Sequence, residues 1–154
     1  MPGPSREVSI RPARPDDYDA IVALWQAAKL PTDAGGRDAR APFLVQRAQF
    51  PDLYLVAEGA ASDGIVGVIL GTHDGRKGWI NRLAVHPDHR RKGIAAALIA
   101  AAEHALRRAG IEIVAALVHR DNDASYGFFR SIGYVDDVPV HYVRKLFRAS
   151  AEPH

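Results

Sequence analysis

A basic, glycine-containing turn between two regular apolar segments constrains the fold of this chain more than any other feature. Residues 79–85 read Trp-Ile-Asn-Arg-Leu-Ala-Val, a short apolar run typical of a buried strand. Pro87 ends this strand because proline has no N–H for a sheet ladder. After the turn, apolar residues from Ile94 to Leu106 follow helical spacing, and Gly110 is well placed to end that helix.

The turn predicts a phosphate-binding site. The start of a helix offers free backbone N–H groups, and the helix dipole favours an anion there. Gly93 allows a ligand to approach the backbone closely, while Arg90, Arg91 and Lys92 supply positive charge. A run of charges can equally be a solvated turn, and these residues alone leave that alternative open.

The same residues resemble motif A of the GCN5-related N-acetyltransferases. The family signature Arg/Gln-x-x-Gly-x-Gly/Ala stands here as residues 90–95, and its usual Leu-x-Val-x-Pro stands as residues 83–87. A second family motif, an Asn followed seven residues later by a Tyr and then by Gly-Phe/Tyr, is similar to Asn122, Phe129 and Gly133-Tyr134. The resemblance therefore covers about residues 6–146. Residues 74–79 also resemble a small bacterial subgroup related to the ribosomal-protein acetylating enzymes.

The predicted fold class is α/β (α+β), with a mixed sheet of six to seven strands and helices on both faces. Strands are expected at about residues 7–11, 53–58, 65–70, 79–85, 111–119 and 141–147. Helices are expected at residues 15–29, 94–109 and 121–132, and a further short helix is expected to end at about residue 50. Turns at residues 62–64 and 74–78 make the second to fourth strands an antiparallel meander. The helical crossover makes the fifth strand parallel to the fourth. The resemblance implies the acyl-CoA N-acyltransferase fold, splayed between these two strands around pantetheine.

Three local features carry further expectations. Asp16 is the expected N-cap of the first helix, and Trp25 is expected in the core. Gly67 and Gly71, inside a strand, indicate bulges or close approaches.

Composition narrows the function classes. The 154 residues are expected to form a single domain, residues 1–154. The absence of cysteine excludes disulfides and a thiol nucleophile, and the seven scattered histidines predict no metal site. The net charge of +2 does not indicate nucleic-acid binding, and no apolar run is long enough to span a bilayer. We therefore expect a cytoplasmic monomer or homodimer without nucleic-acid or membrane partners.

The resemblance implies transfer of an acetyl group from acetyl-CoA, as co-substrate, to a primary amine by direct attack in a ternary complex. The residues implied to bind the donor are Leu83, Ala84, Val85, Arg90, Arg91, Lys92, Gly93, Ile94, Ala95, Asn122 and Phe129. The Val85 amide would polarise the thioester carbonyl. Asn122 would hydrogen-bond pantetheine, although it is equally well explained as a plain helix N-cap.

The sequence departs from the family at the catalytic groups. The position of the family's acidic Tyr holds Phe129, which has no proton to donate, and the strand positions of the usual carboxylate base hold Asn81 and Leu117. The remaining catalytic candidates are Tyr126, one helical turn before Phe129, and His119, at the open end of its strand. Tyr126 is also explained as a packed aromatic.

Three function classes follow from these residues. An N-acetyltransferase without a carboxylate base favours an amine of low pKa: a small amine, an amino acid or a peptide N-terminus. The missing Tyr favours the alternative of a non-catalytic acetyl-CoA sensor or interaction module. An acyl-CoA hydrolase is the third class, and it lacks a nucleophile.

Overall fold

The computed structural model describes residues 8–60, 62–136 and 140–147. The chain divides into two compact units, Met1–Leu117 and Val118–His154. We call them the first unit and the second unit.

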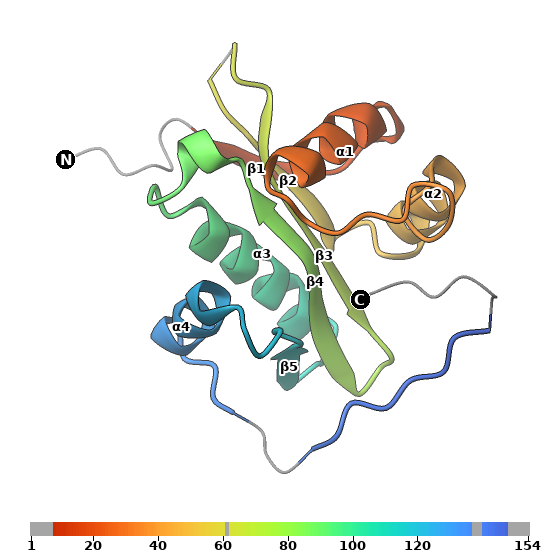
Figure 1. Cartoon of the computed structure of the whole chain (residues 1–154), viewed down its shortest axis with the longest axis vertical. Helices are drawn as coiled ribbons and strands as arrows, with labels where there is room; N and C mark the ends of the chain where they lie inside the picture. The colour runs from red at the N-terminus through yellow and green to blue at the C-terminus, as the bar shows by residue number, and fades with distance from the viewer. Residues whose placement is uncertain (1–7, 61, 137–139, 148–154) are drawn as a thin grey trace. The chain divides into compact units, whose positions relative to one another are not determined.

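A five-stranded mixed sheet forms the centre of the first unit (Figure 1). Its strands, in spatial as well as chain order, are β1 (Ser9–Pro12), β2 (Tyr54–Glu58), β3 (Ile65–His73), β4 (Lys77–Val85) and β5 (Ile113–Ala116). Strands β1 to β4 pair antiparallel in sequence, which confirms the predicted meander. Strand β5 runs parallel to β4, as the helical crossover between them predicts.

The prediction of six to seven strands is wrong, because the described residues contain only five. The last strand expected at residues 141–147 is not formed, and Tyr134 and Val135 lie in no strand either. The apolar side chains of Val140, Tyr142 and Phe147 are exposed, and a strand is stabilised by pairing and burial more than by its own propensity. Pro139, expected in a turn here, lies outside the described residues.

Helices cover both faces of the sheet, as predicted. Helices α1 (Tyr18–Ala27) and α2 (Arg40–Gln49) pack on one face, and α3 (Ile94–Arg108) packs on the other (Figure 1). The face below α1 holds the largest core cluster, which includes Ile21, Leu24, Trp25, Phe43, Tyr54, Val56, Val68, Leu70 and Ala84. The prediction that Trp25 belongs to the core is confirmed.

Gly67 sets the distance between α3 and the sheet. A Cβ atom at this position of β3 would lie 2.9 Å from Leu98 Cδ1 and 3.0 Å from Ile94 Cγ2. The predicted close approach at Gly67 is therefore confirmed, and the element that approaches β3 here is the start of α3. At the other end of α3, Gly110 has a φ of 87°, and Ile111 N–H donates to Leu106 O over 3.0 Å. This is a Schellman closure, and it explains why β5 begins at Ile113 rather than at Ile111.

The entry to α1 differs from the expectation in one residue. A 3-10 turn, η2 (Pro15–Asp17), precedes the helix, and Asp17 rather than Asp16 accepts from the Arg14 N–H over 2.7 Å. Asp17 also accepts two hydrogen bonds from the Arg11 guanidinium. Asp17 is chosen because its side chain is turned toward β1 and buried, whereas Asp16 is exposed.

The described residues of the second unit form one helix, α4 (Asp123–Ser131). Asn122 caps it by accepting from the Ser125 N–H over 3.1 Å, and Gly133 ends it with a φ of 100°. The predicted boundaries of this helix are therefore confirmed to within a residue or two. None of its described residues is buried.

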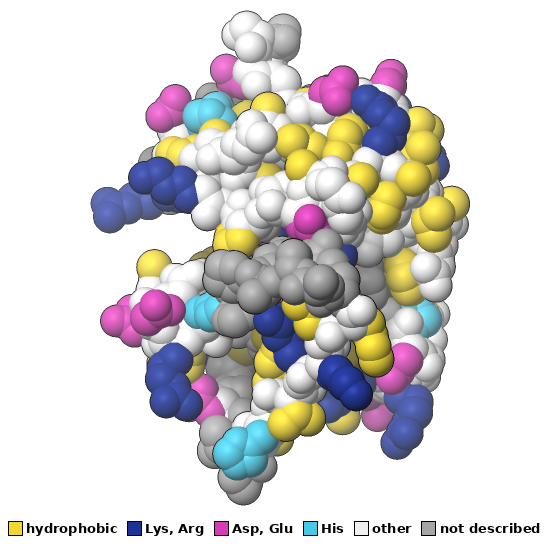
Figure 2. Space-filling model, turned by 45° about the vertical axis from the view of Figure 1, so that its right-hand side comes forward, with side chains coloured by type: hydrophobic (Ala, Val, Ile, Leu, Met, Phe, Trp, Pro, Cys, Tyr) yellow, Lys and Arg dark blue, Asp and Glu magenta, His cyan; other side chains and the backbone are white. Residues whose placement is uncertain are grey.

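The outer surface of the first unit is apolar in places. Figure 2 shows hydrophobic side chains gathered over α1 and α2. On α2, Leu44 and Val45 are exposed, so this helix is anchored to the core chiefly by Phe43. Among the described residues, no helix combines the length and the apolar character needed to cross a membrane.

Candidate functional site

The basic turn leaves β4 and leads directly into α3. The His86 N–H donates to Val66 O over 2.8 Å, and a short 3-10 turn, η3 (Pro87–His89), follows. Arg91 and Gly93 then adopt left-handed conformations, with φ angles of 65° and 77°. The four residues at positions 90–93 are all exposed. Two left-handed residues in close succession turn the chain sharply, so that α3 begins directly behind the cluster of positive charge.

The start of α3 has free hydrogen-bond donors. No side chain caps it, and the first helical bond runs from Ala97 N–H to Gly93 O over 3.0 Å. The N–H groups of residues 94–96 therefore have no acceptor within the helix. Buried apolar side chains at Ile94 and Leu98 hold this end of the helix against the sheet. The free backbone donors, the helix dipole and the exposed cationic side chains together suit a phosphate or pyrophosphate.

The second element of the site is the open edge of β4. Parallel pairing with β5 covers only four residue pairs, from Lys77↔Ile113 to Ile80↔Ala116. Residues 81–85 of β4 pair with β3 on one side and extend beyond the end of β5 on the other. The two strands are therefore not bonded along their whole length, which is the condition that the predicted opening requires.

The pairing alternation shows which main-chain groups reach this edge. Because His86 N–H bonds to Val66 O, the next pair, Gly67↔Val85, is of the type that does not exchange hydrogen bonds. The N–H and C=O of Val85 then point away from β3, toward the open edge. Those of Ala84 point toward Val68 instead, and its side chain is buried in the core. Val85 thus fits a donor role better than Ala84 does.

The remaining predicted residues lie in the second unit. The Tyr126 hydroxyl donates to Asp136 Oδ2 over 2.8 Å and accepts from Arg130 Nη1 over 3.1 Å. The Phe129 ring is half-buried and packs edge-on against Tyr134, with 5.1 Å between ring centroids. Asn122 makes the helix cap described above, which leaves its amide nitrogen available to a ligand. His119 is exposed at the start of this unit, and its backbone carbonyl accepts from the Asn122 N–H.

The structure therefore brings two groups of predicted residues together, each within its own unit. Leu83, Ala84 and Val85 lead along the chain to the turn at residues 90–95 in the first unit. The second unit collects His119, Asn122, Tyr126 and Phe129 on and around α4.

Sequence reasoning missed one charged residue at this edge, Arg82. It has a φ of 50° and stacks on Trp25, with 4.4 Å from its guanidinium carbon to the ring centroid. Its only signal in the sequence is that an arginine interrupts an otherwise apolar strand.

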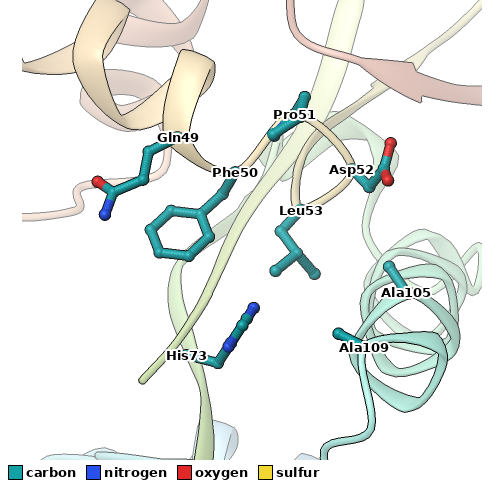
Figure 3. A pocket seen from close by; sticks show the side chains of 8 residues that line it. All are labelled: Gln49, Phe50, Pro51, Asp52, Leu53, His73, Ala105 and Ala109. Atoms are coloured by element: carbon teal, nitrogen blue, oxygen red, sulfur yellow. The ribbon is translucent and has the colours of Figure 1, made fainter. Parts of the chain in front are cut away.

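A small pocket of about 120 Å³ lies elsewhere in the first unit. Figure 3 shows Phe50 and His73 on one side of it and, on the other, Ala105 of α3 and the C-cap residue Ala109. These alanines lie at the end of α3, about 16–22 Å from its start at 1.5 Å per residue. The pocket is therefore separate from the anion-binding turn.

Comparison with known proteins identifies the family of this chain. The family model described as the acetyltransferase (GNAT) family matches residues 19–134. The chain belongs to this family. It is 36% identical over 127 residues to an acetyltransferase of Pectobacterium atrosepticum, covering 82% of this chain and 87% of that protein. It is also 36% identical over 129 residues to an acetyltransferase of Photorhabdus laumondii, covering 84% and 87%.

Solved structures show the same fold. Ard1 of Thermoplasma volcanium has a TM-score of 0.73 at 24% identity, over 84% of this chain and 83% of that one. The PaiA N-acetyltransferase of Thermoplasma acidophilum, solved in complex with coenzyme A, has a TM-score of 0.71 at 21% identity, over 86% and 92%. The predicted membership in the GNAT family and the predicted enzyme class, an acetyl-CoA-dependent N-acetyltransferase, are confirmed. The finer resemblance to the ribosomal-protein acetylating subgroup stays a prediction.

Proposed function

We propose that this enzyme transfers an acetyl group from acetyl-CoA to a primary amine of low pKa, by direct attack in a ternary complex. The acceptors we favour are a small amine, an amino acid or a peptide N-terminus. The observation that carries the proposal is the uncapped start of α3 next to the open edge of β4 at residues 81–85.

In this proposal the turn holds the pyrophosphate of the donor. The N–H groups of residues 94–96 and the close backbone approach at Gly93 supply the cradle, and Arg90, Arg91 and Lys92 supply neutralising charge. Main-chain groups of Leu83 and Val85 pair with the pantetheine arm along the open edge of β4. Asn122 adds a hydrogen bond from its amide nitrogen, and Phe129 adds an apolar contact. The main chain of Ala84 pairs with Val68 and so holds Leu83 and Val85 in the strand.

The chemistry then needs three groups from the protein. The Val85 N–H polarises the thioester carbonyl and stabilises the oxyanion that forms as the amine attacks. A C–N bond forms, the C–S bond breaks, and the amine loses a proton while the thiolate gains one. Tyr126 is the proposed acid for the thiolate, and His119 is the proposed base for the amine.

The preference for an amine of low pKa follows from the missing carboxylate. A lysine side chain, with a reference pKa of about 10.4, is almost wholly protonated at neutral pH, whereas an α-amine at about 7.7–8.0 is partly free. With Asn81 and Leu117 at the usual positions of the base, the enzyme has no carboxylate there to deprotonate a lysine side chain.

We also propose that the two units belong to one acetyltransferase domain. The family match from residue 19 to residue 134 crosses the boundary between Leu117 and Val118. Residues implied in donor binding come from both sides of that boundary, which supports the same proposal.

The donor site is tested by calorimetric titration of CoA. Gly93→Val should abolish binding, because a β-branched residue disfavours the left-handed conformation and blocks the approach to the backbone. Gly75→Val is the matched control, since Gly75 is also left-handed, with a φ of 85°, but lies in the β3–β4 turn. Arg91→Ala should weaken binding by about 1.5–3 kcal/mol if a charge-assisted hydrogen bond is lost. Unchanged affinity in folded Gly93→Val and Arg91→Ala variants would reject the site.

The acceptor class is tested by thiol release from acetyl-CoA with two probes. Glycinamide presents an α-amine, and Nα-acetyl-lysine amide presents a side-chain amine. The proposal predicts a higher kcat/KM for glycinamide near neutral pH. A preference for the lysine derivative would contradict it.

The sensor is the second candidate function, and the phenyl ring of Phe129 at the usual position of the acid favours it. CoA binding without acetylation of either probe, and without thiol release, would contradict the proposed acceptor class and favour the sensor. Thiol release in the absence of any amine would establish a hydrolase instead.

A further inference from the structure

A bulge in β4 redirects the side chain of Arg82. The register of the β3–β4 pair runs from Leu70↔Asn81 to Val68↔Ala84, so Arg82 and Leu83 together oppose the single residue Ile69. Arg82 occupies the left-handed region, with a φ of 50°, which non-glycine residues adopt rarely and at a cost. Without the extra residue, alternation would point Arg82 toward α3. With it, Arg82 points to the face that α1 covers.

On that face the Arg82 guanidinium makes three contacts. It lies over the Trp25 ring, its Nη1 donates to Pro31 O over 2.8 Å, and its Nη2 lies 3.4 Å from Asp38 Oδ2. Pro31 and Asp38 both lie in the link between α1 and α2, which comprises residues 28–39. We call residues 31–38 the α1–α2 segment. In Figure 1 this segment crosses in front of the sheet between the two helices.

The α1–α2 segment is organised around Asp38. Asp38 Oδ2 accepts from the Asp33 N–H over 2.8 Å, and the Asp38 N–H donates to Asp33 O over 3.0 Å. The Tyr18 hydroxyl donates to Asp38 O over 2.7 Å, which ties the segment to α1. Arg82 adds the tie to β4, and it holds the first and the last residue of the segment at once.

This arrangement is costly for stability. Only 23% of the Arg82 side chain is exposed, and burial lowers the pKa of its guanidinium in spite of the charge on Asp38. Its Nε atom and Trp25 Nε1 are buried and make no hydrogen bond to any described residue, and its buried Nη2 has only the 3.4 Å ion pair with Asp38. Buried donors without acceptors destabilise a fold, and an apolar residue at this position of the strand would avoid that cost. A strained, partly unsatisfied arginine is therefore expected to have a functional reason.

The position of Arg82 suggests that reason. It belongs to residues 81–85, the open edge where the proposed function places the thioester, and α3 covers the opposite face of the sheet. An amine that approaches this edge from the α1 face meets the α1–α2 segment. Resting on the proposed function, we propose that Arg82 is a positioning residue that fixes the α1–α2 segment as one wall of the amine pocket.

Hydrogen exchange monitored by mass spectrometry tests the clamp directly. Arg82→Lys keeps the charge but cannot stack on Trp25 and hold both ends of the segment. Peptides that cover residues 31–39 should then exchange roughly tenfold faster, because local opening sets their protection. Asp38→Asn keeps an oxygen for the Asp33 N–H and removes the charge. It should also speed exchange in the same peptides, and it provides the test if Arg82→Lys fails to fold.

Arg11→Lys is the matched control. Arg11 makes a comparable set of contacts, to Asp17, Glu58 and Pro12 O, but lies on β1 at the other edge of the sheet. This variant should leave exchange at residues 31–39 unchanged. Equal exchange in the wild type, Arg82→Lys and Asp38→Asn would overturn the proposal.

Kinetics separate positioning from a general loss of structure. Arg82→Lys should raise the KM for glycinamide roughly tenfold and leave the KM for acetyl-CoA within about twofold, since only the acceptor wall has moved. Faster exchange with an unchanged KM for glycinamide would overturn the role in the amine pocket.

The donor site serves as an internal reference in the same exchange experiment. CoA should protect peptides that cover residues 90–96 in the wild type and in Arg82→Lys alike. Absence of that protection in the wild type would count against the proposed function, whereas the change at residues 31–39 reports on Arg82 alone.

Discussion

Asp17 shows how one carboxylate fastens the first strand to the first helix. Burial by itself would raise the pKa of Asp17, but the hydrogen bonds from the Arg11 guanidinium and the Arg14 N–H outweigh it and hold this pKa below its ordinary value. The same pair raises the pKa of Arg11. The pKa of Asp17 is therefore lower in the folded protein than in the unfolded chain. Its contribution to stability is fully present when the pH is above the pKa of the unfolded chain, and it is lost as the pH falls through the pKa of the folded protein.

Asp17→Asn should therefore lower the free energy of unfolding at pH 7 by about 1–3 kcal/mol, the usual range for hydrogen bonds to a charged group. The difference from the wild type should shrink below about pH 4, the reference pKa of an unfolded aspartate. Asp16→Asn, at the exposed neighbour, should change little. Urea titrations from pH 2 to pH 7 measure all three proteins, and a difference that does not depend on pH would contradict the assignment.

Tyr126 and Phe129 carry the prediction about the general acid. Phe129→Tyr should keep or raise kcat, because it restores a hydroxyl at the family's usual position. Tyr126→Phe should lower kcat roughly 10²–10⁴-fold if Tyr126 has taken over as the acid. Tyr142→Phe, at an exposed tyrosine of the same unit, is the control for the loss of a phenol. A silent Tyr126→Phe variant would restrict Tyr126 to its hydrogen bonds with Arg130 and Asp136.

At the residue scale, the sequence predicts best where a local rule decides. Asn122 caps α4, and Gly110 ends α3 in a left-handed conformation, as their chemistry suggests. Asp17 was missed in favour of Asp16 because capping preferences treat the two aspartates alike, and only the folded chain shows that the Asp17 side chain is turned toward Arg11, six residues earlier on β1. Arg82 was missed because its contacts come from residues 44 to 57 positions earlier in the chain.

Gly67 sets a limit on the side chains between β3 and α3. Gly67→Ala should lower Tm, because its Cβ would meet Leu98 and Ile94 at 2.9–3.0 Å and overpacking destabilises a core. Gly127→Ala should raise the free energy of unfolding by about 0.5–1 kcal/mol, since Gly127 lies within α4 with nothing near its Cβ position. Thermal unfolding of both variants checks the contrast, and equal shifts would contradict it.

At the element scale, turns and crossovers were predicted and a bulge was not. The Asp-Gly turns and the helical spacing predict both ends of β2, β3, β4 and α3 to within three residues. The bulge at Arg82 has no local signature, because it depends on how β4 fits against Ile69. At residues 141–147, in contrast, a strand was predicted that does not form. An alternating apolar pattern does not produce a strand where the side chains stay exposed.

The whole molecule combines a well-packed first unit with a second unit that has no buried residue among those described. Nine residues of α4 are too few for a stable isolated helix in water, where about 12–15 are marginal. A peptide of residues 118–154 should therefore show little helix by circular dichroism. The full chain should show the additional helix at the same residues by NMR chemical shifts. A peptide that folds alone would contradict the proposal of one domain.

The open edge of β4 has a consequence for how this enzyme can change over evolutionary time. Main-chain N–H and C=O groups are the same whichever side chain stands at a position, so a ligand held by them tolerates many substitutions. The proposed wall around the amine, in contrast, is the α1–α2 segment, whose position depends on the side chains of Arg82 and Asp38. Mutations can therefore redirect the enzyme to a new acceptor without costing it the acetyl donor, and a gene duplicate of this enzyme starts with half of its specificity already inherited.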